Sequence, residues 1–247
     1  MAENSKNSEN KDKFKFEREG LDFPFYNNNP HLSNEKWIIL TIGFLITLLF
    51  GLIPKTGIPQ YIAEFIYFLI PFATFLYVAN GKLGLICKKF QKSDIWLILG
   101  TIILYFVYSL VMGVLLKSLG IVAHTNPAIS HLDSILFWIA FPFQIFGEEL
   151  IKVIPFIIVL FLIYKFTGRR KLGIIMATLV SVIIFGILHY NAYGSIITVI
   201  LIQGIGSIIM LFAYLKSKNI LTSYIVHLAT DTILFLGALS AGAGFLF

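Results

Sequence analysis

The residues of this chain that could do chemistry are ionisable side chains placed inside long apolar runs. A charged side chain at the centre of a lipid bilayer costs at least ~2.5–3.5 kcal/mol, so such residues are rare unless they serve a purpose. Carboxylate, ammonium and imidazole groups are those of acid–base or metal chemistry. The residues form three clusters and are Glu148, Glu149, Lys152, His189, His227 and Asp231.

The first cluster, Gly-Glu-Glu-Leu-Ile-Lys at residues 147–152, places two adjacent carboxylates near a lysine. On a helix Lys152 lies three residues from Glu149 and four from Glu148, so its ammonium can reach either one. Because adjacent carboxylates repel each other, one glutamate could serve as an ionised base while the lysine holds the other. The alternative is an ion pair that only anchors one helix to another.

The other two clusters contain histidines. Phe185 precedes His189 by four residues, and His227 precedes Asp231 by four residues, so each pair shares a helix face. Asp231 could accept a hydrogen bond from His227 and fix its tautomer, or both could face one substrate or ion. The alternative for His189 is an interfacial residue or a satisfied hydrogen-bond donor, and the alternative for His227 and Asp231 is a polar contact between helices. Gln203, in a further apolar run, either lines the same pocket or joins two helices.

The composition identifies a membrane protein. Hydrophobic residues make up 57% of the 247 residues, the mean hydropathy is +0.85, and only 13% of residues are charged. A soluble domain carries about 25% charged residues. The net charge of +6 does not indicate nucleic-acid binding, because the basic residues lie in loops between apolar runs. The single cysteine, Cys87, excludes a disulfide framework and a multi-cysteine metal site.

Seven apolar segments are long enough to cross a bilayer, which predicts an all-α, polytopic transmembrane bundle. The fourth segment is too long for one span, so it either projects past the membrane or breaks near Pro142, and a break would raise the count to eight. We expect the fourth, fifth and seventh segments to bring the three clusters to one polar pocket. His124 and His131 fall in a loop and should be solvated. The segments are 37–53, 61–79, 95–116, 134–164, 172–190, 195–215 and 220–239.

The lysines and arginines predict the orientation of the bundle. The N-terminal tail holds six of them, and the successive loops hold one, four, one, four, none and two. Positively charged loops stay on the cytoplasmic side, so the N-terminus is expected to be cytoplasmic. Residues 1–36 then form a polar cytoplasmic tail that is largely disordered or lies on the membrane surface, and residues 37–247 form the transmembrane domain.

The three clusters resemble the motifs of the CPBP family, the CAAX-protease and bacteriocin-processing membrane proteins also called the Abi family. The family pattern is Glu-Glu, then Phe-x-x-x-His, then His-x-x-x-Asn or Asp, on successive membrane helices. Residues 134–240 contain all three in this order. The first motif usually continues to an arginine, whose position here is Val153. Lys152 instead gives Glu-Glu-x-x-Lys, which resembles the PrsW-type membrane proteases.

This resemblance implies an intramembrane endopeptidase that acts on a membrane-associated peptide or protein. Glu148 or Glu149 with His189 would activate water, while His227 and Asp231 would hold the oxyanion or orient the carbonyl, with Lys152 and Phe185 in support. We expect metal-free chemistry. The alternative is a Zn²⁺ ion held by Glu149, His189 and His227. Leader peptides, pheromones and bacteriocin precursors are the expected substrates, ahead of prenylated CAAX proteins, in a bacterial cytoplasmic membrane.

Two other functions are compatible with the sequence. The chain could be a non-enzymatic immunity or regulatory protein that acts through helix–helix binding, with a purely structural polar core. It could also be a proton-coupled transporter, although no internal repeat or interrupted helix pair supports that function. The sequence does not determine the oligomeric state.

Overall fold

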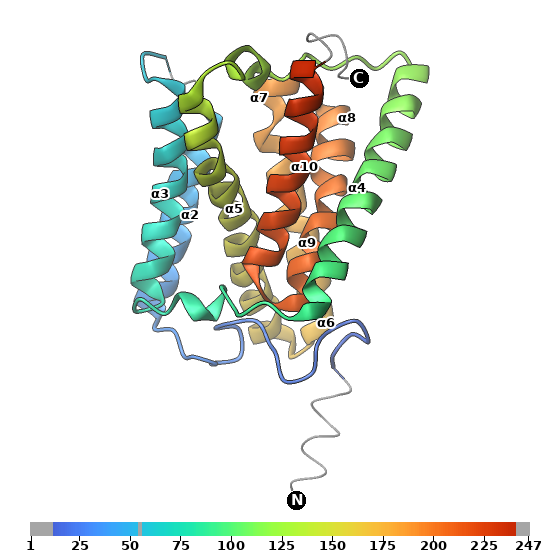
Figure 1. Cartoon of the computed structure of the whole chain (residues 1–247). Helices are drawn as coiled ribbons and strands as arrows, with labels where there is room; N and C mark the ends of the chain where they lie inside the picture. The colour runs from blue at the N-terminus through green and yellow to red at the C-terminus, as the bar shows by residue number, and fades with distance from the viewer. Residues whose placement is uncertain (1–11, 54–55, 241–247) are drawn as a thin grey trace, which may run out of the picture.

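The regular elements of the chain are helices. A computed structural model describes residues 12–53 and 56–240, and the elements within these ranges are all helical (Figure 1). Seven stretches are long and apolar enough to cross a membrane, which confirms the expected transmembrane bundle. They are α2 (Asn34–Leu52), α3 (Gln60–Val78), α4 (Lys92–Ser118), α5 (Ile135–Thr167), α6 (Arg170–Leu188), the stretch Ile196–Ser217, and α10 (Ile220–Ser240). Short elements connect them: η1 (Leu83–Leu85), η2 (Pro127–His131) and α7 (Tyr190–Tyr193).

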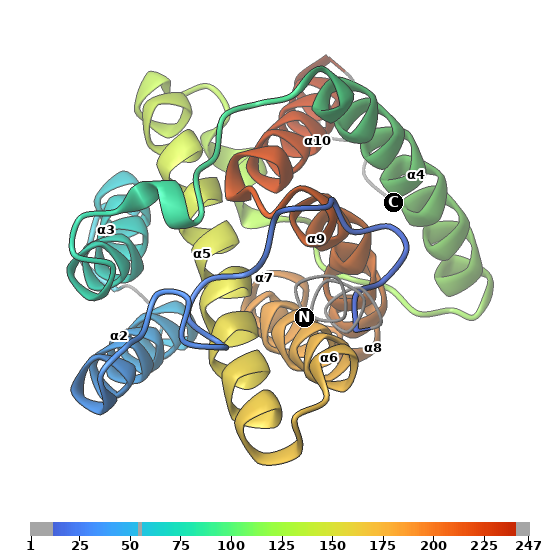
Figure 2. The same ribbon diagram turned by 90° about the horizontal axis from the view of Figure 1, so that it is seen from below.

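The spans form one bundle around α5. Seen from below in Figure 2, α5 lies between the α2–α3 pair on one side and α6, α9 (Gly206–Ser217) and α10 on the other. The end of the bundle where α4 ends and α5 begins, at the top of Figure 1, is called the upper end here. The N-terminal segment lies across the opposite, lower end. α5 therefore contacts both halves of the bundle and can bring the first cluster close to residues from either half.

The helix α5 is continuous, so of the two alternatives for the long fourth segment, the break near Pro142 and its eighth span are absent from the described residues. Its 33 residues correspond to ~50 Å at 1.5 Å per residue, longer than the bilayer core. One face of the additional turns is buried at the upper end, where Phe137 and Phe141 pack against Phe235 of α10. Gly168 ends the helix in the left-handed conformation with φ 65°.

The sixth span contains a stretch of π-helix. It consists of α8 (Ile196–Thr198), the π-helical η3 (Val199–Ile205) and α9 (Gly206–Ser217). In a π-helix the backbone hydrogen bonds join residues five apart, so the pairing differs from that of the flanking α-helices. In this stretch the backbone carbonyl of Leu201 accepts a hydrogen bond from the hydroxyl of Tyr108 at 2.6 Å. η3 also lies very close to α6, because a Cβ on Gly186 would lie 2.7 Å from the carbonyl oxygen of Val199. Such wide turns are frequent at functional sites.

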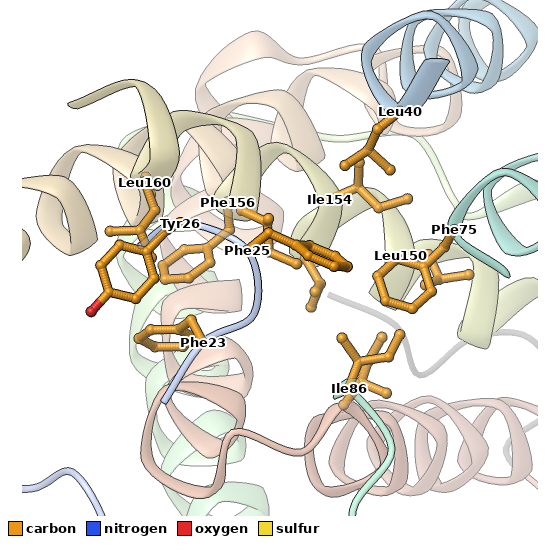
Figure 3. Close-up of a cluster of buried hydrophobic side chains, with 14 of the residues drawn as sticks. Phe23, Phe25, Tyr26, Leu40, Phe75, Ile86, Leu150, Ile154, Phe156 and Leu160 are labelled. Atoms are coloured by element: carbon orange, nitrogen blue, oxygen red, sulfur yellow. The ribbon is translucent and has the colours of Figure 1, made fainter. Parts of the chain in front are cut away.

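The main hydrophobic core lies towards the lower end and includes part of the N-terminal segment (Figure 3). Phe23, Phe25 and Tyr26 are buried in it, and the ring centroid of Phe23 lies 4.8 Å from that of Phe156 on α5. An aromatic side chain buries a large apolar area, so these three residues contribute substantially to the stability of the bundle. The N-terminal segment therefore packs against the spans as part of the fold.

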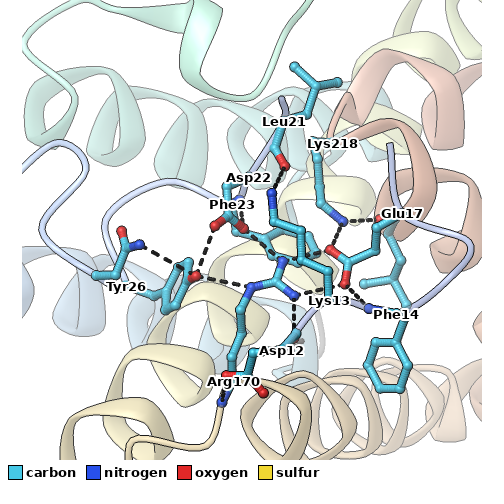
Figure 4. A network of polar contacts seen from close by, with 12 residues as sticks. Asp12, Lys13, Phe14, Glu17, Leu21, Asp22, Phe23, Tyr26, Arg170 and Lys218 are labelled. Atoms are coloured by element: carbon cyan, nitrogen blue, oxygen red, sulfur yellow. Dashed lines mark hydrogen bonds and ion pairs between the residues drawn. The ribbon is translucent and has the colours of Figure 1, made fainter. Parts of the chain in front are cut away.

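Buried charges fix the same segment to the lower ends of the helices (Figure 4). The Arg170 guanidinium binds both carboxylate oxygens of Glu17 at 2.6 and 2.7 Å, and also Asp22 at 2.7 Å. Lys218 binds Glu17 at 2.7 Å. Burial opposes ionisation of Glu17, but Arg170 and Lys218 outweigh it and lower its pKa to about 2. Burial lowers the pKa of Lys218 to about 8, although Glu17 opposes the shift.

This arrangement differs from a disordered tail, one of the two forms that the sequence predicts for residues 1–36; the other, a segment at the membrane surface, is compatible with its place across the lower end of the bundle. The difference concerns the described residues of that tail, because residues 1–11 lie outside the described ranges. Aromatic residues that alternate with charges are typical of a membrane-surface segment. Here both the aromatic and the charged side chains of the segment contact residues that lie far along the chain. Arg170 and Lys218 pair with Glu17, and Asp94 pairs with Arg18.

Candidate active site

A cavity of about 160 Å³ lies between α4, α5, α10, the sixth span and the end of α6. This volume is enough for several water molecules. Part of its wall is formed by the loop residues 123–126 near the upper end. The pocket expected between the fourth, fifth and seventh spans is therefore present, and the third and sixth spans also line it. Its polar lining includes Glu148, His189, Tyr193, Gln203, His227 and Asp231.

Glu148 is the glutamate that faces the cavity. Its Oε2 lies 3.8 Å from Nε2 of His189 and 3.6 Å from Nε2 of His227. Its Oε1 accepts a hydrogen bond from the side chain of Gln144, one turn earlier on α5, at 2.9 Å. One carboxylate oxygen is thus held by the helix, and the other is left to face the two imidazoles.

Glu149 points away from the cavity and forms a buried ion pair with Lys152. Both side chains are fully buried. Oε1 of Glu149 also accepts a hydrogen bond from Nδ1 of His227 at 2.8 Å. The Lys152 ammonium lies 4.6 Å from the centre of the Phe185 ring, which gives it a second favourable contact. The lysine at this position therefore does reach a glutamate, and the glutamate it reaches is the one that orients His227.

His189 is positioned by the end of α6. The helix ends at Leu188, and the backbone N–H of His189 bonds the carbonyl of Gly186. The carbonyl of Phe185 then accepts a hydrogen bond from Nδ1 of His189 at 2.8 Å. This bond places the proton on Nδ1 and directs Nε2 towards Glu148. The side chain of His189 is 21% exposed, which is compatible with contact with cavity water.

His227 and Asp231 come from α10 and complete the cluster. Because Nδ1 of His227 donates to Glu149, its Nε2 faces the cavity, 3.6 Å from both Glu148 Oε2 and Asp231 Oδ2. The tautomer of His227 is thus fixed by Glu149, whereas the sequence had offered Asp231 for this role. Phe185 packs beside both imidazoles, with ring centroids 4.6 Å from His189 and 5.8 Å from His227. All the predicted site residues lie in one connected group.

Several residues near the site were not predicted from the sequence. Tyr193 and Tyr105 line the cavity, and the hydroxyl of Tyr193 accepts a hydrogen bond from Asn126 at 3.1 Å. His124, expected to be solvated, is exposed and also lines the cavity. Glu64 of α3 is buried beside a second cavity that Glu148 and His189 also line. An ionisable residue in an apolar run was the signal used for the other clusters, and it would have identified Glu64 as well.

The residues proposed as zinc ligands do not converge on one point. The Glu149 carboxylate is occupied by Lys152 and by Nδ1 of His227, on the side of that ring away from His189. Both contacts are made to Oε1, where the Lys152 cation already neutralises the carboxylate, while Oε2 has no hydrogen-bond partner in the described part of the chain. Among residues 12–53 and 56–240, no group of three or more His, Cys, Asp or Glu side chains has an arrangement that could hold a metal ion. The chain's own residues thus do not fit the zinc triad that was the alternative to metal-free chemistry, and no step below involves a metal.

The fold and the cavity define a class: a multi-pass membrane protein with a carboxylate–imidazole site enclosed among its helices. Residues 130–233 match the family model described as type II CAAX prenyl endopeptidase Rce1-like. This match confirms the resemblance to the CPBP, or CAAX protease, family and identifies that segment as CAAX-protease-like. It covers less than half of the chain, and the first three spans lie outside it. No curated protein and no solved structure matches the chain.

Proposed function

We propose that this protein is an intramembrane endopeptidase that hydrolyses a peptide bond of a membrane-associated substrate. The observation that carries the proposal is the convergence of Glu148 and the Nε2 atoms of His189 and His227 within 3.6–3.8 Å at a cavity large enough for water. Peptide hydrolysis needs an activated water, a stabilised oxyanion and a proton for the leaving amine. The family match supports a membrane protease of the CAAX class.

Glu148 and His189 are the proposed water-activating pair. A water between them can give a proton to this pair as its oxygen attacks the scissile carbonyl. The same proton is then delivered to the leaving amine. Glu149 is unsuited to this role, because its carboxylate pairs with Lys152 and orients His227. The structure thus favours Glu148 over Glu149, two candidates between which the sequence does not decide.

His227 is the proposed electrophilic group. Its Nδ1–H is held by Glu149, which directs Nε2 towards the cavity; in the imidazolium form Nε2 also carries a proton and can donate it in a hydrogen bond to the oxyanion. Asp231 lies 3.6 Å from the same nitrogen and would orient the imidazole. Loss of one oxyanion donor typically lowers the rate by about 10²–10³-fold. Lys152 and Phe185 hold these groups in place without reaching the substrate.

Metal-free chemistry is part of this proposal, and it is supported by the failure of Glu149, His189 and His227 to converge. The measurement is hydrolysis by purified protein with and without a chelator, together with metal analysis of the same sample. Chelator-resistant hydrolysis in a metal-free sample is expected. Activity that disappears with chelator and returns with Zn²⁺ would contradict this part and leave the peptidase assignment in place.

The peptidase assignment is tested with variants of the full chain in lipid vesicles. The probes are internally quenched peptides that are anchored by an apolar helix, anchored by a prenylated cysteine, or free. Glu148→Gln and His189→Ala should each lower hydrolysis by at least about 10²-fold, because each removes half of the proton-transfer pair. Glu19→Gln makes the same chemical change at an exposed position of the N-terminal segment and should leave hydrolysis unchanged.

The same variants distinguish the non-enzymatic alternative. If Glu148→Gln and His189→Ala keep the full biological activity of the chain, the role is immunity or regulation by helix binding. Transport would appear instead as uptake into sealed vesicles. Leader peptides, pheromones and bacteriocin precursors in a bacterial cytoplasmic membrane are the proposed substrates, and the two anchored probes and the free one test this preference against CAAX-like substrates.

A further inference from the structure

A second cavity lies on the other side of Glu148 and His189. It has a volume of about 390 Å³ and lies among residues of α2, α3, α5 and α6. Glu148 and His189 are the two residues that line both this cavity and the first one. α3 is held against α5 here, because a Cβ on Gly147 would lie 2.9 Å from the Cα of Phe68. The second cavity therefore lies directly beside the proposed water-activating pair.

Glu64 of α3 faces this cavity and has a carboxylate oxygen without a partner. The residue is 7% exposed, and its Oε1 accepts a hydrogen bond from Gln60, one turn earlier, at 2.7 Å. Its Oε2 is buried and has no hydrogen-bond partner in the described part of the chain. Burying a carboxylate oxygen without a donor is costly, and native structures rarely leave such an atom unpaired without a reason. A ligand that supplies a donor would satisfy it.

The surroundings of Glu64 favour a cationic ligand. Glu148 is a second carboxylate on the same cavity, and His189 and Tyr67 are the other titratable groups that line it. The remaining walls are largely apolar, with Ala63 and Leu188 among them. A lysine or arginine side chain has a matching form, since its methylene groups lie along apolar surface while its charged end needs an acceptor.

Glu64 also faces a smaller cavity towards the upper end. That cavity holds about 40 Å³ and is lined by Gln60, Glu64 and residues of the loop that precedes α5, including His131 and Ser134. The carboxylate therefore lies between this loop and the proposed water-activating pair. A substrate segment that enters past the loop would meet Glu64 before its peptide bond reaches Glu148.

We propose that the second cavity is a specificity subsite, in which Glu64 binds a cationic group of the peptide substrate close to the scissile bond. The cation is either a lysine or arginine side chain or the ammonium group of a free N-terminus. This inference rests on the proposed peptidase function and adds to it the charge of the substrate. Gln60 is a positioning residue that holds the Glu64 carboxylate towards the cavity.

The test uses matched peptides in lipid vesicles with the full chain. One series carries lysine or norleucine at each position flanking the scissile bond, and a second has a free or an acetylated N-terminus. The wild-type protein should prefer the cationic member of one series by about tenfold or more in kcat/KM, the size expected for one charged hydrogen bond. Glu64→Gln should bring this ratio close to one. Asp133→Asn makes the corresponding change at an exposed residue of the same loop and should keep the ratio.

Binding to the inactive Glu148→Gln protein separates this inference from the proposed function. The cationic peptide should bind more tightly than its neutral partner, and adding Glu64→Gln should remove the difference. If Glu64→Gln fails to fold, Glu64→Asp keeps the charge and should keep the preference. Equal binding of the two peptides, or a preference that survives Glu64→Gln, would overturn the subsite. Preferential binding without any hydrolysis by the wild-type protein would instead overturn the peptidase function.

Discussion

Two adjacent glutamates on α5 have opposite surroundings. Successive residues of a helix are separated by about 100°, so Glu148 and Glu149 cannot face the same side. Glu148 faces the cavity and two imidazoles, whereas Glu149 is fully buried against Lys152 and His227. The pair therefore divides two tasks: one carboxylate is available for proton transfer, and the other orients a histidine.

Lys152 should be essential for stability and not for the chemistry itself. Lys152→Met leaves the Glu149 carboxylate buried without its cation, and removing one partner of a buried ion pair costs about 3–5 kcal/mol. The Glu149→Gln/Lys152→Met double variant removes both charges and should recover much of that loss. Thermal unfolding in detergent, followed by circular dichroism, measures both. Equal destabilisation by the single and double variants would contradict a stabilising ion pair.

Most residues of the site could be predicted from the sequence, whereas the separate role of each residue could not. The spacing predicts that Lys152 contacts one of the two glutamates on a helix. The sequence does not indicate which glutamate faces the cavity, because that depends on how α5 is rotated against α6 and α10. The part of Glu64 in the site was not predicted for a different reason. Glu64 lies in a span outside the segment that contains the motifs, and it reaches the site only through the packing of α3 on α5.

At the scale of the elements, glycines set the distances that position the site. Gly186 allows α6 to approach the π-helical η3, and the next residues of α6 lead to His189. Gly147 allows α3 to approach α5 next to Glu148. The seven spans themselves follow from their apolar runs, whereas these close approaches and the π-helix depend on tertiary packing.

Gly186→Val should lower both stability and activity. Its Cβ would lie 2.7 Å from the Val199 carbonyl oxygen and 3.0 Å from Gly204, so α6 and η3 would have to separate. Overpacking of this kind costs about 1–3 kcal/mol, and the shift would also displace His189. Unfolding and peptide hydrolysis are the two measurements.

Gly237→Ala on α10 is the control for that variant. No atom lies within 4 Å of a Cβ placed at Gly237, so an alanine there meets open space. Alanine is also favoured over glycine within a helix by about 0.5–1 kcal/mol. This variant should therefore be as stable as the wild type or slightly more stable, with unchanged hydrolysis. A Gly186→Val protein with the same behaviour as Gly237→Ala would show that the close approach of α6 and η3 is not required.

For the whole molecule, the N-terminal segment joins parts of the chain that are far apart in sequence. Arg18 pairs with Asp94 at the start of α4, and Glu17 pairs with Arg170 and Lys218 at the lower ends of α6 and the sixth span. The sequence could not predict these pairs, because a charged residue in a polar tail gives no indication of a distant partner. The site lies elsewhere in the bundle, so the network acts on stability and not directly on the proposed chemistry.

This network should make stability depend on pH in the acidic range. Glu17 has an ordinary pKa of 4.5 and a folded-state pKa of about 2, so the unfolded chain takes up a proton that the folded chain does not. The contribution of Glu17 is therefore complete above about pH 4.5 and is lost as the pH falls towards 2. By linkage the difference corresponds to about 3 kcal/mol. Because other carboxylates also titrate in this range, the wild type must be compared with Glu17→Gln at each pH.

The difference in unfolding midpoint between the wild type and Glu17→Gln is the measurement. It should be largest at neutral pH, where Glu17→Gln leaves Lys218 without its nearest carboxylate, and should shrink steadily from about pH 4.5 downwards. Glu19→Gln alters an exposed carboxylate two residues away and should follow the wild type throughout. A difference that stays constant between pH 6 and pH 3 would mean that Glu17 stabilises the fold through packing alone. The buried charges would then play no part in attaching the N-terminal segment to the lower end of the bundle.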